Sequence, residues 1–214
     1  MKILITGASG FIGSFIVEHA LSEGMEVWAG IRSTSSHRYL NDDHIHFIEL
    51  DFDNPEKLNK QLLSHFSING KWDYIVHAAG ATKCLHRKEF FQTNTMGTKS
   101  FMKALIACDM TPKMFVYISS LSIFGPVREQ QPYTDIMDTD TPMPDTAYGE
   151  SKLKSEEFLD MFENFPHIIL RPTGVYGPRE KDYFMMAKSI KGHTDFAVGY
   201  KPQELTFVYV LDLV

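Results

Sequence analysis

Six short runs of apolar, β-favouring residues recur along the chain, separated by polar or amphipathic stretches. The runs span residues 2–6, 25–31, 45–50, 72–79, 113–120 and 167–172. Their apolar residues are nearly continuous rather than alternating, which is the pattern of strands buried on both faces of a sheet. The sequence therefore predicts a covered, parallel sheet of six strands.

Helical patterns fill most of the stretches between these runs. Apolar residues recur at helical spacing over residues 14–24, and helices are also predicted through residues 94–108 and over residues 147–165. Another helix starts after Asn54, a favourable cap, with Pro55 at its first position. Strands that alternate with helices predict an α/β fold, a doubly wound parallel sheet of the Rossmann type.

One long stretch, residues 126–146, interrupts this alternation. It contains many acidic residues and four prolines: Pro126, Pro132, Pro142 and Pro144. This composition predicts a long surface loop, and loops of that length in compact domains are often functional.

Composition and charge narrow the class of protein. The 214 residues are 43% hydrophobic and 22% charged, as in ordinary soluble globular proteins. No apolar run approaches the roughly 18 residues of a membrane span, and the first residues lack the long apolar stretch of a signal peptide. The net charge of −6 argues against a general nucleic-acid binder, which needs a basic surface.

Cysteine and histidine usage adds two expectations. Cys84 and Cys108 form no CxxC pair, which indicates a reducing, cytoplasmic environment without a disulfide framework. The nine histidines show no metal-ligand spacing, so no metal site is predicted.

A glycine-rich turn joins the first predicted strand to the first predicted helix. Gly7, Gly10 and Gly13 have the spacing GxxGxxG. Glycines at such a turn permit a tight bend and let a pyrophosphate approach the backbone at the start of a helix. A lone glycine motif also occurs for steric reasons, but the flanking strand and helix favour nucleotide binding here.

A set of hydroxyl and amino groups is predicted at the carboxyl end of the same sheet. Ser119, Ser120 and Ser122 follow the fifth strand, and Tyr148 and Lys152 are four apart on the next helix, on one face. A tyrosine whose phenolate is favoured by a nearby ammonium can exchange a proton with a substrate alcohol or carbonyl. A serine hydroxyl would hold the reacting oxygen.

Seven short motifs occur in a characteristic order. They are TGASGFIG (6–13), HAAG (77–80), NTMGT (94–98), SSLSIFG (119–125), YGESK (148–152), LRPTGVYGP (170–178) and FVYVLDLV (207–214). In this order the chain resembles the extended short-chain dehydrogenase/reductase superfamily, the NAD-dependent epimerase/dehydratase type. One departure is Phe124, which stands where that pattern usually has tyrosine.

The resemblance assigns roles to individual residues. Counted back from Gly125, the catalytic serine is Ser120, with Tyr148 and Lys152 completing the site. It implies cofactor contacts from the following residues: Gly7, Ser9, Gly10, Phe11, Ile12, Gly13, Asp51, Phe52, Ala78, Ala79, Gly80, Asn94, Ser119, Pro172, Thr173 and Val175.

The resemblance also implies how the chain is organised. Residues 1–172 would form the NAD(P)-binding Rossmann domain, and residues 173–214 would begin a substrate-binding lobe. Relatives normally continue past this point, so the substrate lobe is expected to be incomplete and the chain truncated. Relatives often form homodimers through a four-helix contact, for which the helices near 94–107 and 147–165 are the candidates.

The end of the second predicted strand bears on the choice of cofactor. No acidic residue stands there, and Ile31 occupies about the place where NAD-preferring relatives carry aspartate. Arg32 and Ser33 follow instead. Because a guanidinium binds phosphate bidentately, we expect NADP to be preferred over NAD. The alternative is that Arg32 is a solvated loop residue.

Three functions remain open from the sequence. The first is an NAD(P)-dependent oxidoreductase with a carbonyl or alcohol substrate, which Arg32 favours. The second is a nucleotide-sugar epimerase that recycles its cofactor within one turnover. The third is a catalytically silent cofactor-binding protein or an inactive fragment. A dehydratase would place Thr-Asp-Glu at positions 120–122, and those acids are absent.

Overall fold

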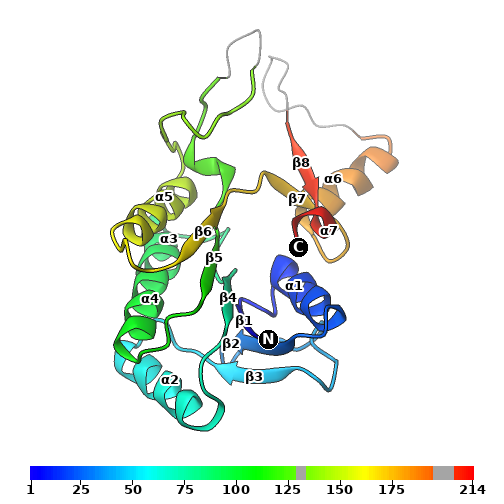
Figure 1. Ribbon diagram of the computed structural model, residues 1–214. Coiled ribbons are helices and arrows are strands. Elements are labelled where there is room, and N and C mark those ends of the chain that lie inside the picture. The colour runs from blue at the N-terminus through cyan, green and yellow to red at the C-terminus, as the bar shows by residue number, and fades with distance from the viewer. Residues whose placement is uncertain (129–133, 195–204) are drawn as a thin grey trace.

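A six-stranded parallel sheet forms the centre of the computed structural model, which describes residues 1–128, 134–194 and 205–214 (Figure 1). Its strands are β1 (Lys2–Thr6), β2 (Glu26–Ile31), β3 (His46–Glu49), β4 (Tyr74–His77), β5 (Met114–Ile118) and β6 (His167–Leu170). They lie in the order β3-β2-β1-β4-β5-β6, and every neighbouring pair is parallel. This is the doubly wound order, so the predicted fold class is confirmed.

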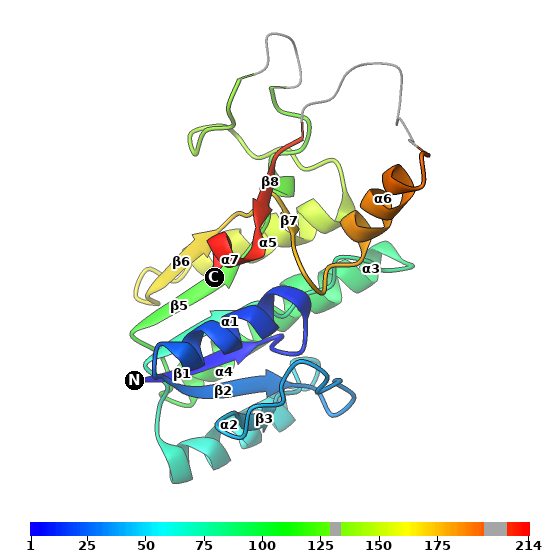
Figure 2. The same cartoon turned by 90° about the vertical axis from the view of Figure 1, so that its right-hand side faces the viewer.

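Helices cover both faces of this sheet (Figures 1 and 2). They are α1 (Phe11–Ser22), α2 (Pro55–Asn69), α3 (Arg87–Phe90), α4 (Gly97–Ala107) and α5 (Ala147–Asp160). The helix α1 lies on one face, and α2, α4 and α5 lie on the other. A π-helical turn, Phe91–Met96, joins α3 to α4.

Two predicted helix boundaries are wrong, and a third, which the sequence left open, is now placed. The helix α1 begins at Phe11 rather than at residue 14, because the Gly10 N–H bonds back to the Gly7 carbonyl (2.9 Å) and ends the turn early. The helical segment through residues 94–108, whose start the sequence left open, begins at Arg87. The helix α5 ends at Asp160, where the chain turns toward β6 instead of continuing to residue 165.

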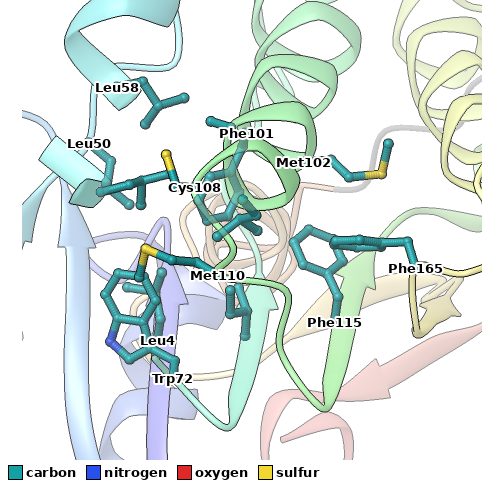
Figure 3. Close-up of a cluster of buried hydrophobic side chains, with 14 of the residues drawn as sticks. Leu4, Leu50, Leu58, Trp72, Phe101, Met102, Cys108, Met110, Phe115 and Phe165 are labelled. Atoms are coloured by element: carbon teal, nitrogen blue, oxygen red, sulfur yellow. The ribbon is translucent and has the colours of Figure 1, made fainter. Parts of the chain in front are cut away.

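Two apolar clusters hold the helices to the sheet. The larger lies under α2, α4 and α5, where Trp72, Phe101 and Phe115 are buried completely or nearly so (Figure 3). The smaller lies under α1 and includes Ile5 and Val17. Burial on both faces explains the nearly continuous apolar residues of the inner strands β1, β2, β4 and β5, whereas the edge strands β3 and β6 are more exposed.

The C-terminal segment forms a small unit beside the carboxyl end of the sheet. It contains β7 (Gly174–Tyr176), α6 (Asp182–Lys191), β8 (Phe207–Tyr209) and α7 (Val210–Leu213). The strands β7 and β8 pair in parallel, which the sequence analysis did not predict. The ring of Tyr183 on α6 packs edge-on against Phe207 of β8, with centroids 4.9 Å apart.

The predicted loop over residues 126–146 contains no helix before α5 and no strand in its described part, and Pro132 lies outside the described residues. The ends of this loop are joined by Arg128, whose guanidinium donates twice to the Asp140 carboxylate (2.7 Å each). No helix within the described ranges is long and apolar enough to cross a bilayer.

Candidate active site

The glycine turn brings β1 and β4 together at the carboxyl edge of the sheet. Gly7 has φ +67°, and a Cβ there would lie 2.6 Å from the Ala79 nitrogen and 2.7 Å from the Ala78 carbonyl. A Cβ at Gly13 would lie 2.2 Å from the Gly7 carbonyl oxygen. Glycine is therefore required at both positions by the close approach of backbone to backbone.

The first turn of α1 is open to an anion. Its N-cap, Gly10, has no side chain to bond the first N–H groups, and the turn contains no acidic residue. Ser9, Phe11 and Ile12 stand in the same turn and are half-buried. Unpaired N–H groups and the helix dipole together attract negative charge, so this turn fits the pyrophosphate of a dinucleotide.

The expected adenosine side lies past β2 and β3. Arg32 is exposed there, with its backbone N–H donating to the Ser35 hydroxyl (3.0 Å). Its guanidinium forms no ion pair with the residues that the structure describes. Asp51 is paired with Lys57 (3.1 Å), and Phe52 packs against His77. Ser33, also exposed, follows Arg32 directly.

Asn94 lies in the π-helical turn and fixes the loop that follows β4. It is fully buried, its amide oxygen accepts from the Ala81 N–H (2.7 Å), and its amide nitrogen donates to the Ala81 carbonyl (3.0 Å). That nitrogen also donates to the Ser151 hydroxyl on α5 (2.9 Å). A Cβ at Gly80 would lie 3.3 Å from Lys152 Nζ, so this loop passes directly over the lysine.

Ser120 and Tyr148 meet at the end of β5. Ser120 caps a short 3₁₀ turn, where its hydroxyl accepts from the Ser122 N–H (3.2 Å). Tyr148 lies in the first turn of α5, whose N-cap Thr146 accepts from the Gly149 N–H (3.0 Å). A Cβ at Gly149 would lie 2.3 Å from the Ser122 carbonyl oxygen, so the first turn of α5 packs directly on the Ser120 turn. Burial raises the pKa of Tyr148, and the nearby Ser120 hydroxyl acts in the opposite direction.

Lys152 lies one turn further along α5 and is only 5% exposed. Its ammonium donates to the Ile118 carbonyl (2.7 Å) and lies 4.7 Å from the centre of the Tyr117 ring. Burial lowers the pKa of Lys152 to about 8, and the carboxylate of Glu156 acts in the opposite direction. The ammonium therefore bonds to β5, and the expected lowering of the Tyr148 pKa by Lys152 is not seen among the protein's own groups.

A buried ion pair that the sequence did not predict lies beneath this site. Glu156, only 2% exposed, accepts from the Ser119 hydroxyl and from Arg171 at the end of β6 (Nη2–Oε2 2.8 Å, Nε–Oε2 3.1 Å). The available signal was the spacing, since Glu156 is four residues after Lys152 and shares its face of the helix. The role of Arg171 had no such local signal.

The last predicted contacts lie between β6 and β7. The Pro172 carbonyl accepts from the Leu121 N–H (2.9 Å), which brings this segment beside the Ser120 turn. The Thr173 hydroxyl donates to the Thr206 carbonyl (2.7 Å), and Val175 is half-buried on β7.

His77 at the end of β4 is a buried structural residue. Its ring nitrogens bond to Thr6 (2.7 Å) and Thr98 (3.1 Å), and burial lowers its pKa to about 3. Within the described ranges, no group of three or more His, Cys, Asp or Glu residues is placed to hold a metal ion. Cys84 and Cys108 are both free thiols.

A doubly wound α/β fold with a glycine turn at the start of its first helix is the arrangement typical of dinucleotide-binding proteins. Over residues 3–214 the chain matches the model of the NAD dependent epimerase/dehydratase family. The protein belongs to this family, as its motifs predicted.

Relatives with assigned activities are identical to this chain at about a quarter of the aligned positions. The UDP-glucose 4-epimerase of Lactobacillus helveticus is 25% identical, over 83% of this chain and 52% of its own length. The GDP-6-deoxy-D-mannose reductase of Pseudomonas aeruginosa is 27% identical, over 89% of this chain and 57% of its own length. Among solved structures, the Bordetella bronchiseptica enzyme WbmG in complex with NAD is 26% identical with a TM-score of 0.77, and the match covers 100% of this chain and 66% of that one. The chain thus spans between half and two thirds of these relatives.

Proposed function

We propose that this chain carries the cofactor site and the proton-transfer site of an NAD(P)-dependent enzyme that transfers hydride to or from a nucleotide sugar. The packing of the first turn of α5, which holds Tyr148, on the turn capped by Ser120 carries the proposal, since both lie at the same sheet edge as the glycine turn. The nucleotide sugar as substrate is suggested by the relatives, whose names include UDP-glucose 4-epimerase and GDP-6-deoxy-D-mannose reductase.

In this proposal two side chains of the protein, Ser120 and Tyr148, carry out the proton transfer. A bound nicotinamide would supply the hydride acceptor or donor. Ser120 holds the reacting oxygen, and Tyr148 takes the proton from an alcohol or gives it to the oxygen of a carbonyl. The raised pKa of Tyr148 suits the neutral, proton-donating form, and the Ser120 hydroxyl favours the phenolate that the reverse transfer requires.

A cofactor panel tests this function. We expect the protein to bind a nicotinamide dinucleotide and then act on UDP-, GDP- or dTDP-sugars. Net oxidation of NAD(P)H would indicate a reductase, and isomerisation of the sugar without net oxidation would indicate an epimerase. Failure to bind any nicotinamide dinucleotide would refute the proposal, whereas binding without turnover of carbonyl compounds or sugars would leave a silent cofactor-binding protein.

The exposed guanidinium of Arg32 supports NADP over NAD as the preferred cofactor within this proposal. It follows β2, has no carboxylate partner among the described residues, and is followed by the hydroxyls of Ser33 and Ser35. These groups suit a 2′-phosphate and leave ribose hydroxyls without an acceptor.

Arg32→Ala is therefore expected to weaken NADPH binding while leaving NADH binding unchanged. Charge-assisted hydrogen bonds contribute about 1.5–3 kcal/mol, which corresponds to a loss of about ten- to a hundred-fold in affinity. Fluorescence titration with both cofactors measures this difference. Arg38→Ala, on the same loop, is the matched control. Equal affinities for NADH and NADPH in the wild type, unchanged in Arg32→Ala, would show that Arg32 does not bind the phosphate.

The predicted homodimer contact through α4 and α5 is a second part of the proposal. Ile106 on α4 and Met161 after α5 are exposed, 42% and 75%, and would be covered by such a contact.

A further inference from the structure

Arg179 holds an unusual backbone conformation in the turn after β7. Its φ is +76°, in the left-handed region that residues with a Cβ rarely adopt. Such a conformation costs free energy and persists only where the surroundings fix it. The contacts of the side chain show what fixes it here.

The guanidinium of Arg179 is bound to the outer face of α1. It donates to the Ser14 hydroxyl (2.9 Å) and to the Glu18 carboxylate (2.5 Å), and it lies 4.2 Å from the centre of the Phe15 ring. On its other side it lies 4.6 Å from the Tyr39 ring. Its side chain is only 19% exposed, so these interactions are partly shielded from water and correspondingly stronger.

Ser14 links Arg179 to the glycine turn. It is fully buried, and its hydroxyl donates to the carbonyl of Phe11, the first residue of α1. Arg179 is therefore two hydrogen bonds away from the turn that is proposed to hold the pyrophosphate.

The next residue along the chain, Glu180, fixes α6 to the same turn. Its carboxylate accepts from the N–H groups of Asp182 (2.6 Å) and Tyr183 (2.7 Å) at the start of the helix. Asp182 in turn pairs with Lys83 (2.5 Å), in the loop that follows β4. The turn after β7 thus lies against α1, and α6 reaches from it to the β4 loop (Figure 2).

We propose that Arg179 is a positioning residue that couples the C-terminal segment to the glycine turn and thereby slows release of the bound dinucleotide. The proposal rests on the proposed function, since it requires a cofactor along α1. The segment in question begins with the proposed cofactor contacts Pro172, Thr173 and Val175 and ends at Arg179. Among the described residues, the Arg179 guanidinium makes the side-chain hydrogen bonds from this turn to α1, so its loss is expected to loosen the segment beside the cofactor.

Stopped-flow measurement of NADH and NADPH release tests the coupling. Arg179→Met is expected to raise the release rate about ten-fold, within the usual range of coupling between linked sites. The release rate of Arg179→Lys, which keeps the charge and one donor group, should lie between those of the wild type and Arg179→Met. Ser14→Ala should raise the rate by itself and add little to Arg179→Met, because both remove the same hydrogen bond.

Arg128→Met is the matched control. Arg128 also has a left-handed backbone (φ +62°) and a paired guanidinium, but it lies in the loop after β5. The coupling would be overturned if Arg179→Met and Ser14→Ala released the dinucleotide as slowly as the wild type and the control do. A lower melting temperature of these two variants would not change that conclusion. Should Arg179→Met fail to fold, Ser14→Ala and Arg179→Lys decide alone. Failure of the wild type to bind either dinucleotide would instead refute the proposed function.

Discussion

Tyr148→Phe is expected to lower turnover about a thousand-fold, since a positioned acid or base contributes about 10²–10⁴ in rate. The substitution removes the phenolic hydroxyl and keeps the ring, which packs against Phe90 with centroids 6.2 Å apart. Binding of the dinucleotide should stay close to that of the wild type, because the glycine turn and the first turn of α1 do not contact this hydroxyl. Turnover of the best substrate from the panel, measured beside cofactor affinity, gives both values.

Tyr74→Phe provides the matched control for this experiment. Tyr74 stands at the beginning of β4, at the opposite end of the strand from His77 and the glycine loop. Its hydroxyl should be dispensable for turnover. Wild-type turnover in Tyr148→Phe would remove Tyr148 from the mechanism and with it the hydride-transfer chemistry proposed for the site. A parallel loss of cofactor binding would show instead that the tyrosine maintains the fold of the site.

The sheet was predictable because its signals are local. Most strands of the sheet are apolar runs of four to six residues, and the Asn54–Pro55 pair marks the beginning of α2 as expected. The start of α1 was misplaced because it depends on a hydrogen bond between Gly10 and Gly7, which no propensity describes. The pairing of β7 with β8 joins segments about 30 residues apart in the chain, and neither strand exceeds three residues.

The candidate site shows the same division between local and distant signals. The spacing of Tyr148 and Lys152 on one helix brought them to the same region. The end of β5 indicated three serines, among which the family resemblance selected Ser120. The direction of the Lys152 ammonium, toward the Ile118 carbonyl, was not predictable from spacing, because it depends on how α5 packs on β5. Glu156 and Arg171 were missed for that reason as well, since their contact joins α5 to β6.

Glu156→Gln is expected to destabilise the fold by about 3 kcal/mol, the lower end of the cost of removing one partner from a buried ion pair. The lower end applies because the Arg171 side chain is 28% exposed and keeps some contact with water. Glutamine keeps the shape and one acceptor for Ser119 but leaves the guanidinium without a counter-charge. Urea unfolding of wild type and variant at neutral pH measures the difference.

The same substitution should change the pH dependence of any activity that needs a protonated Lys152. The pKa of Lys152 is already lowered to about 8 by burial, and the Glu156 carboxylate opposes that shift. Removing the carboxylate lowers the pKa further, so the charged form, present below the pKa, is lost at a lower pH as the pH rises. The alkaline limb of the rate profile is therefore expected to move toward neutral pH in Glu156→Gln.

The neighbouring acid provides the control for both measurements. Glu157 is half-exposed and paired with Lys154 (2.6 Å) three residues away, a surface ion pair that contributes little to stability. Glu157→Gln should leave the unfolding curve and the alkaline limb of the rate profile as they are in the wild type.

Equal stability of Glu156→Gln and Glu157→Gln would mean that the contact between α5 and β6 does not depend on the buried charge. An unmoved alkaline limb in a folded Glu156→Gln would mean that the lysine does not set it. Because the two readouts depend on different partners of Glu156, Arg171 for stability and Lys152 for the pH profile, either result can fail without the other.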